Sequence, residues 1–118
     1  MLKKIFAAVI VFSAIFSATA NAAPDGSHWI MAQNNYAYLW NPSPTDGETV
    51  TWSGGYIHDG GYRYAHGFGT VIWYRYGQAV QVDEGSFYYG RHDGTFKHRF
   101  LRSGRVEYSH WRRGVEVG

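Results

Sequence analysis

The stretch His66 to Gly69, HGFG, is the first candidate for chemistry, because glycine-rich turns can cradle phosphate groups. A phosphate loop opens a helix and carries a Lys-Ser/Thr signature. Here the glycines are followed by TVIWY, residues 70–74, which is typical of a strand. We therefore expect the glycines to form the corner of a β-hairpin, with His66 bonded to a carbonyl of the turn.

The histidines of the chain lack the spacing of a metal site. Such sites usually combine close histidine pairs, such as His-x-x-x-His, or cysteines. The chain has no cysteine, and no such pair occurs among His58, His66, His92, His98 and His110. The sequence therefore predicts no metal and no other cofactor.

Two adjacent pairs could supply a nucleophile or an acid and a base: Asp83-Glu84 and Ser109-His110. In a strand, sequence neighbours point to opposite faces, so neither pair can act together. We predict no catalytic residue, and a protein that is not an enzyme. A small hydrolase is an alternative that needs two carboxylates meeting across strands.

The first 22 residues predict a secretory signal peptide. Lys3 and Lys4 form its basic start, Ile5 to Phe16 its apolar run, and Ala20-Asn21-Ala22 its cleavage site. A membrane anchor is the alternative, but a spanning helix needs about 20 apolar residues. We therefore expect an exported protein, periplasmic or secreted. Without cysteine it has neither disulfides nor a lipid-anchored cysteine.

The charges of the 96 residues after position 22 balance but are unevenly spread. Residues 23–90 carry two basic and six acidic side chains, whereas residues 91–113 carry seven basic and two acidic ones. One end can attract anions, but a nucleic-acid partner is not predicted, because such proteins carry a stronger basic surface.

The composition predicts an all-β fold with many turns. The chain has five Trp, ten Tyr and 15 Gly, which favour strands and turns respectively. Residues 23–48 are interpreted as an extended leader and a Pro-rich loop, and 49–118 as the folded domain. Strands are expected at about 49–56, 70–76, 79–89, 95–102 and 105–112.

The domain contains internal similarity. HGFGTVIWYRYG, residues 66–77, aligns with DGTFKHRFLRSG, residues 93–104, at an offset of 27. EGSFYYG, residues 84–90, aligns with YSHWRRG, residues 108–114, at an offset of 24. The shared unit is a hairpin bounded by glycine turns.

On these residues the chain resembles a MORN-repeat protein. The family motif opens Tyr-x-Gly, continues to His-Gly-x-Gly and ends in an aromatic strand and a glycine. Residues 52–77 carry it, with Trp52 as the opening aromatic; residues 83–104 and 107–114 carry weaker copies. The resemblance implies a single-layer antiparallel β-meander with one hairpin per repeat. It also implies a role in protein–protein contacts or scaffolding.

The weaker copies depart from the motif at Asp83, which replaces the opening aromatic, at Phe96 and at Ser109, which replace glycines. Elsewhere, Gly54 and Gly85 are expected to leave room for an aromatic ring to lie across the backbone. Large rings are then expected to cover both faces of one sheet.

Exposed aromatic residues are the strongest functional signal, because contiguous apolar surface marks interaction sites and Tyr, Trp and Arg dominate binding hot spots. The alternative is that the rings only cover the sheet. The aromatic residues at repeat positions are assigned to structure: Trp52, Trp73, Phe87, Phe100 and Trp111. The predicted binding residues are Tyr56, Tyr62, Tyr64, Tyr74, Tyr76, Tyr88, Arg99, Arg112 and Arg113.

A protein partner is the expected ligand of this surface. The alternative is an anionic lipid or polysaccharide of the cell envelope, bound by the tyrosine rings and the basic segment 91–113 in a salt-sensitive manner. Because a short meander has open edges, we also expect a homo-oligomer, or capping of the edges by residues 23–48.

Overall fold

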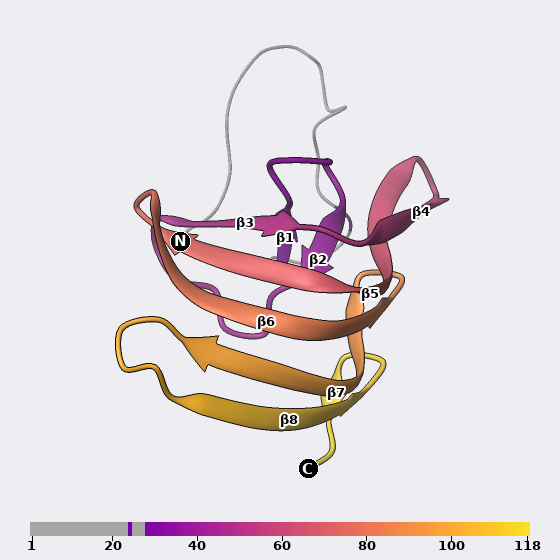
Figure 1. The fold of residues 1–118 in the computed structure, drawn as a ribbon. Helices are drawn as coiled ribbons and strands as arrows, with labels where there is room; N and C mark the ends of the chain where they lie inside the picture. The colour runs from indigo at the N-terminus through magenta and orange to yellow at the C-terminus, as the bar shows by residue number, and fades with distance from the viewer. Residues whose placement is uncertain (1–23, 25–27) are drawn as a thin grey trace.

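The computed structural model describes residue 24 and residues 28–118, so the predicted signal peptide lies outside the described residues. The described part is all-β, as expected, and forms one curled nine-stranded sheet without a helix (Figure 1). Its strands are β1 Trp29–Met31, β2 Tyr38–Trp40, β3 Glu48–Trp52, β4 Gly55–Asp59, β5 Tyr62–Arg75, β6 Gln78–Tyr88, β7 Arg91–Phe100, β8 Val106–Arg112 and β9 Val115–Glu116. In the described residues, no helix is available that could span a membrane.

Strands β5 to β8 follow one another as an antiparallel meander, and β9 adds a short edge to β8. Three of their links are two-residue turns with positive φ at both positions: Tyr76-Gly77, Tyr89-Gly90 and Arg113-Gly114. Positive φ at both positions is the type I′ pattern, which matches the twist of antiparallel strands. The glycines that the sequence alignment paired, at 90 and 114, thus occupy the same place in their hairpins.

The first strands make the sheet more complex than a meander of hairpins. β5 pairs with β4 along its first half and with β3 along its second half, both antiparallel. The β1–β2 hairpin joins the sheet through a parallel bridge between Tyr38 and Tyr64. Residues 28–48, expected as an extended leader, thus contribute two strands to the same sheet.

The HGFG stretch lies inside β5, so the prediction that it forms a hairpin corner is wrong. Its glycines are needed for other reasons. Gly67 has φ of 92°, which L side chains rarely adopt, and an added Cβ at Gly69 would lie 2.8 Å from the Trp52 ring. Gly94, the residue aligned with Gly67, also has positive φ within its strand, β7.

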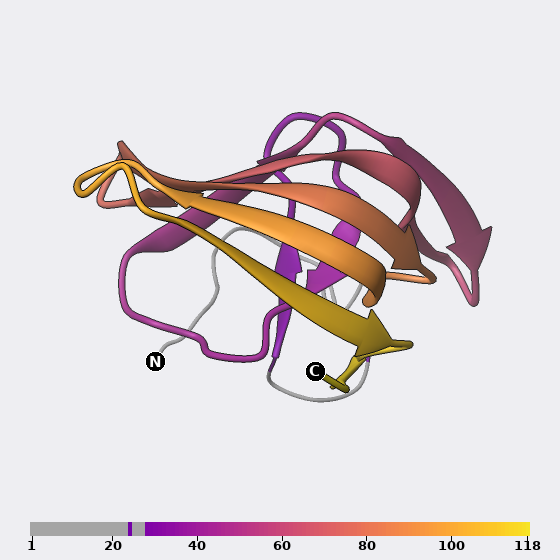
Figure 2. The same cartoon turned by 60° about the horizontal axis from the view of Figure 1, so that its bottom comes forward.

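The core lies on the concave face of the sheet and is built from segments that are far apart in the sequence. Figure 2 shows β1 and β2 beneath the curved strands β5 to β8. Side chains that alternate along β5 and its neighbours point inward, and they pack against residues of β2 and β3. The buried apolar residues are Ala32, Ala37, Leu39, Val50, Trp52, Ala65, Val71, Trp73, Phe87 and Phe96. Large rings lie on both faces, as expected, but the concave face is in addition covered by β1 and β2.

Aromatic rings pack against the backbone at Gly54 and Gly85, as the sequence predicts. An added Cβ at Gly85 would lie 2.6 Å from the Phe96 ring, and one at Gly54 would overlap the ring of Trp52. The Phe87 ring links the two, with centroid distances of 5.0 Å to Trp52 and 5.3 Å to Phe96. The aromatic core is thus continuous from β3 to β7.

Candidate functional site

The outer, convex face of the sheet carries an aromatic cluster, which we call the tyrosine–arginine patch: His66, Phe68, Tyr88, Tyr89 and Arg113. Phe68 and Arg113 are exposed, and the other three are half-buried. The Arg113 guanidinium lies 4.1 Å above the Tyr88 ring. The His66 ring is 5.5 Å from that of Tyr88 and 5.2 Å from that of Tyr89. Phe68 is 70% exposed. The structure thus brings together two predicted binding residues, Tyr88 and Arg113.

Two type I′ turns position this patch. Gly90 in the first turn donates a hydrogen bond to the Ala65 carbonyl, which ties the turn to β5. Gly114 in the second turn donates to the His92 carbonyl, and the Arg113 amide donates to the Asp93 carboxylate. The rings and the guanidinium are therefore presented from a fixed backbone.

The predicted residues of the β4–β5 arm divide between its two faces. Tyr56 lies under the Arg63 guanidinium at 4.6 Å. On the other face, Tyr62 and Tyr64 contact each other, and Tyr62 also contacts Tyr38 of β2. Burial, with a smaller contribution from these two tyrosines, raises the pKa of Tyr38 to about 12. Tyr62 and Tyr64 therefore anchor the β1–β2 hairpin.

The other predicted binding residues lie apart from the patch or at its margin. Tyr76 is in the β5–β6 turn, where its ring lies against Gly47. Tyr74 pairs with Thr49 along the outer face, and Arg99 is exposed opposite Val106. Arg112 is exposed at the end of β8, next in sequence to the patch.

The basic residues of segment 91–113 do not form a single surface. Arg91 stacks on the rings of Trp29 and Trp40, at 5.2 and 4.6 Å from their centroids. Arg105, at the opposite end of β8, pairs with Glu107 at 2.8 Å and lies over Phe100. The segment is therefore spread over both ends of the sheet.

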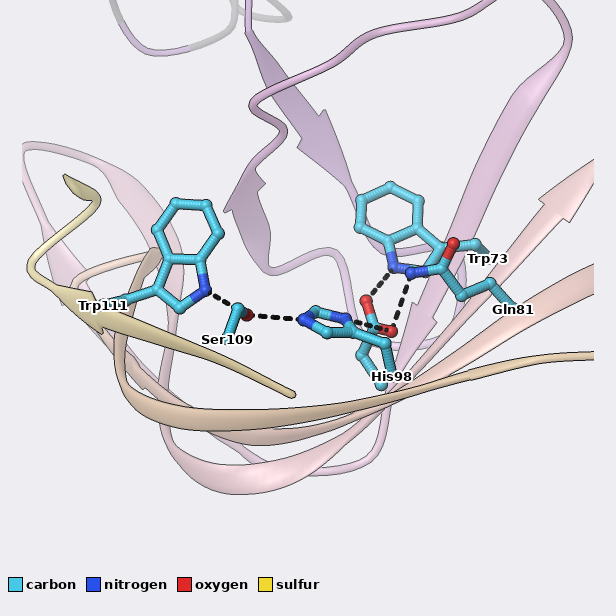
Figure 3. A network of polar contacts seen from close by, with 6 residues as sticks. Trp73, Gln81, His98, Ser109 and Trp111 are labelled. Atoms are coloured by element: carbon cyan, nitrogen blue, oxygen red, sulfur yellow. Dashed lines mark hydrogen bonds and ion pairs between the residues drawn. The ribbon is translucent and has the colours of Figure 1, made fainter. Parts of the chain in front are cut away.

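A second constellation lies on the concave face, where Asp83, His98 and Ser109 form a continuous chain of polar contacts (Figure 3). His98 Nδ1 is 2.8 Å from Asp83 Oδ1, and His98 Nε2 is 2.6 Å from Ser109 Oγ. Trp111 Nε1 donates to Ser109 Oγ at 2.6 Å, and Trp73 Nε1 donates to Asp83 Oδ2 at 2.8 Å. A chain of tryptophan, aspartate, histidine, serine and tryptophan therefore runs from β5 to β8.

Three adjacent strands supply the central residues. Asp83 of β6 lies opposite His98 of β7 in the register. Ser109 of β8 is opposite Phe96 and so lies diagonal to His98 on the same face. Asp83 and Ser109 are buried, at 3% and 7% exposure, and the His98 side chain is 15% exposed.

Two histidines near this chain titrate in opposite directions. The hydrogen bond to Asp83 raises the pKa of His98. Burial lowers the pKa of His92 to about 4. The His92 ring lies among those of Phe87, Phe96 and Trp111, and its Nδ1 has no hydrogen-bond partner among the described residues. His92 is therefore a neutral core histidine, whereas Asp83 stabilises the protonated form of His98.

The sequence draws attention to Asp83 and Ser109, but each as a pair with its neighbour in the chain rather than with His98. Asp83 points inward and Glu84 outward, and Ser109 is buried while His110 is exposed, as strand alternation predicts. The chain forms instead across strands, between Asp83, His98 and Ser109. The sequence signal is that Asp83 and Ser109 are polar departures from the repeat pattern.

The described residues contain no group of three or more metal-binding side chains that could hold an ion. Comparison with known protein families, with characterised proteins and with solved structures finds no match to this chain. Function must therefore be argued from the two constellations themselves.

Proposed function

We propose that this chain is an exported, non-enzymatic binding module that contacts a protein partner through the tyrosine–arginine patch. In this proposal its meander is a short, degenerate set of MORN-type hairpins, and its signal peptide directs it to the periplasm or the exterior. The observation that carries the proposal is Phe68, a large apolar side chain that is 70% exposed on the same face as Tyr88 and Arg113.

Composition and rigidity both support this role. Aromatic residues and arginine carry most of the energy in protein interfaces. The Arg113 guanidinium is already stacked on Tyr88, so little side-chain entropy remains to be lost when a partner binds. Because β1 and β2 lie against the concave face, the outer face is the one left open to a partner.

Capture from an envelope extract tests the proposal, with the purified protein as bait. The variant Phe68→Ala/Tyr88→Ala is expected to retain the partner at least about 30-fold less, the effect of losing a hot spot of about 2 kcal/mol. Tyr108→Ala is the matched control, since Tyr108 is exposed on the outer face of β8, away from the patch. Equal retention by all three baits would show that the patch is not the binding surface.

Salt separates this function from its alternative, the binding of anionic lipid or polysaccharide. Arg113 is exposed and lies over the Tyr88 ring, and Arg112 is exposed next to it in sequence, which favours an anionic ligand. The protein proposal predicts capture at both low and high salt. Binding to vesicles of anionic lipid that is lost at high salt would support the alternative.

Self-association remains part of the proposal, because the C-terminal residues cover the edge of β8 only from His110 to Arg112. Size-exclusion chromatography with light scattering measures it directly. A monomer at all concentrations would exclude pairing through this edge.

A further inference from the structure

The chain Asp83–His98–Ser109 has the order and spacing of a nucleophilic serine relay. A serine is activated when a base lies within hydrogen-bond reach and a third group orients that base. The contacts of 2.6 Å and 2.8 Å meet both conditions. We infer that Ser109 is an activated nucleophile that accepts acyl groups from carboxylic esters, with His98 as its general base and Asp83 as a positioning residue.

Proton accounting supports this direction of transfer. Asp83 accepts at Oδ1, so the neutral His98 ring carries its proton on Nδ1 and leaves Nε2 as an acceptor. Ser109 Oγ already accepts the Trp111 indole N–H. Because Nε2 of the neutral ring can only accept, Ser109 Oγ donates its proton to His98 in the 2.6 Å contact, which is the arrangement required before attack.

Asp83 is held so that it can keep the imidazole in this tautomer. Its Oδ1 also accepts from Gln81 Nε2 at 2.8 Å, and its Oδ2 accepts from Trp73 Nε1 at 2.8 Å. With three donors and 3% exposure, the carboxylate cannot turn away from His98. The same carboxylate stabilises the imidazolium that forms when His98 takes the serine proton.

The charged groups that face His98 favour its protonated form. Asp83 lies on β6, Glu107 on β8 and Glu116 on β9, and all three raise the pKa of His98. His92, on the same strand as His98, is buried and neutral, since its pKa is about 4. His98 can therefore accept the serine proton without a competing positive charge beside it.

The proposed hydrolysis has two stages, acylation of Ser109 and then release of the acyl group by water. Ser109 Oγ forms a bond to the acyl carbon while its proton passes to His98 Nε2, and the carbon–oxygen bond to the alcohol breaks as His98 returns that proton to the leaving alkoxide. Water then attacks the acyl-serine, giving one proton to His98 Nε2, which passes it to Ser109 Oγ as the ester bond breaks. The products are the alcohol and the carboxylic acid, and no further co-reactant is needed.

Access to Ser109 comes from the edge of the sheet. β8 is the last long strand; β9 pairs with it at Trp111 and Arg112, and Val117 and Gly118 hydrogen-bond to the backbone of His110. Ser109 itself is 7% exposed, whereas Glu107, which shares the inner face of β8 with it, is exposed. A small ester would therefore reach Ser109 from the side of Glu107, and the Trp111 indole N–H lies beside the reacting oxygen.

A phosphonyl fluoride probe tests the inference, because it reacts with activated serines and releases fluoride. The purified protein is treated with the probe, and the labelled peptides are identified by mass spectrometry. Label is expected on Ser109 at least about 100-fold faster than on Ser103, which is exposed in the β7–β8 turn and serves as the internal control. Equal labelling of the two serines, or none at Ser109, overturns the inference.

Variants and pH distinguish activation from simple exposure. His98→Gln is expected to slow labelling of Ser109 by about 100-fold or more while leaving Ser103 unchanged. In the native protein the rate should rise with pH as His98 loses its proton. A labelling rate that is independent of pH and of His98 overturns the inference. If His98→Gln does not fold, the relative labelling of Ser109 and Ser103 in the native protein still tests it.

The inference goes beyond the proposed binding function and can fail separately from it. Ser109→Ala should still capture the partner of the tyrosine–arginine patch, which lies on the other face of the sheet. Labelling of Ser109 would remove only the non-enzymatic part of the proposed function. Hydrolysis of p-nitrophenyl acetate by the native protein, but not by Ser109→Ala, would establish turnover.

Discussion

Gly85 is the position where the packing of the concave face can be tested most directly. A Cβ added there would lie 2.6 to 2.7 Å from three atoms of the Phe96 ring, whereas ordinary contacts begin at 3.4 Å. The ring would have to move by nearly 1 Å. It is fully buried, with Phe87 at 5.3 Å and His92 at 4.6 Å between ring centroids, so it has little space to do so.

These contacts set the expected size of the effect of Gly85→Ala. Overpacking of a well-packed core costs about 1 to 3 kcal/mol, and the confinement of Phe96 favours the upper value. The lower entropy of the unfolded alanine chain offsets about 0.4 to 1 kcal/mol. The net loss is about 2 kcal/mol, which lowers Tm by about 8 to 16 °C in a domain of this size.

Urea and thermal unfolding, followed by tryptophan fluorescence and circular dichroism, measure this loss. Gly55→Ala is the matched control, because its added Cβ would meet only the His66 carbonyl, at 3.5 Å. Adding Phe96→Leu to Gly85→Ala should restore part of the stability, since the smaller side chain relieves the overlap. If Gly85→Ala unfolds within about 2 °C of Gly55→Ala, the argument from ring packing is refuted.

Three further changes test other features of the structure. Gly77→Ala should cost about 1 to 2 kcal/mol in urea unfolding, because φ is 83° there although nothing lies near the added Cβ; Gly77→Asn should cost less, and equal costs would contradict this. Asn34→Ala should cost about 1 to 3 kcal/mol in the same assay, because the Trp52 amide loses its 3.0 Å hydrogen bond and the Trp52 carbonyl keeps only the 3.2 Å bond from Asn35; an effect near zero would contradict it. For His92, whose pKa is lowered from 6.5 to about 4, the unfolded chain takes up the proton first, so stability falls from about pH 6.5 to about pH 4. His92→Phe should remove this slope, whereas the contribution of His98, whose pKa is raised, is complete below pH 6.5 and is lost as the pH rises through its folded value.

Local patterns in the sequence predict much of the sheet. Strand alternation puts Val71 and Trp73 on one face and Ile72 on the other, and the structure buries the first two. The strands expected near 79–89 and 105–112 correspond to β6 and β8. The repeat alignment also pairs glycines that share a backbone conformation. These features depend on neighbouring residues in the chain, so one sequence is enough to reveal them.

The features that were missed depend on contacts between distant segments. HGFG was expected at a corner because glycine is common in turns, but β5 runs through it and is paired by β3, β4 and β6. Residues 28–48 have few strand signals, yet they join the sheet because Leu39 and its neighbours bury apolar surface on the concave face. The tyrosines at 62 and 64 were expected on the surface for a partner, but the β1–β2 hairpin takes that position.

The Asp83–His98–Ser109 network depends on a bulge in β7. The spacing of these residues in the sequence therefore does not predict that they meet. Near the β6–β7 turn, Ser86 pairs with Asp93, and continuing that register would place Phe96 opposite Asp83. Instead the register shifts by two residues between Glu84 and Ser86, so that His98 lies opposite Asp83. Gly94, with φ of 97°, lies within this irregular stretch, and the Phe96 ring is free to cover Gly85. The irregularity that seats the core ring therefore also aligns the polar chain. A shift of two residues keeps every side chain on its own face. Residues of the outer face can therefore be substituted independently of the hydrogen-bond network on the concave face.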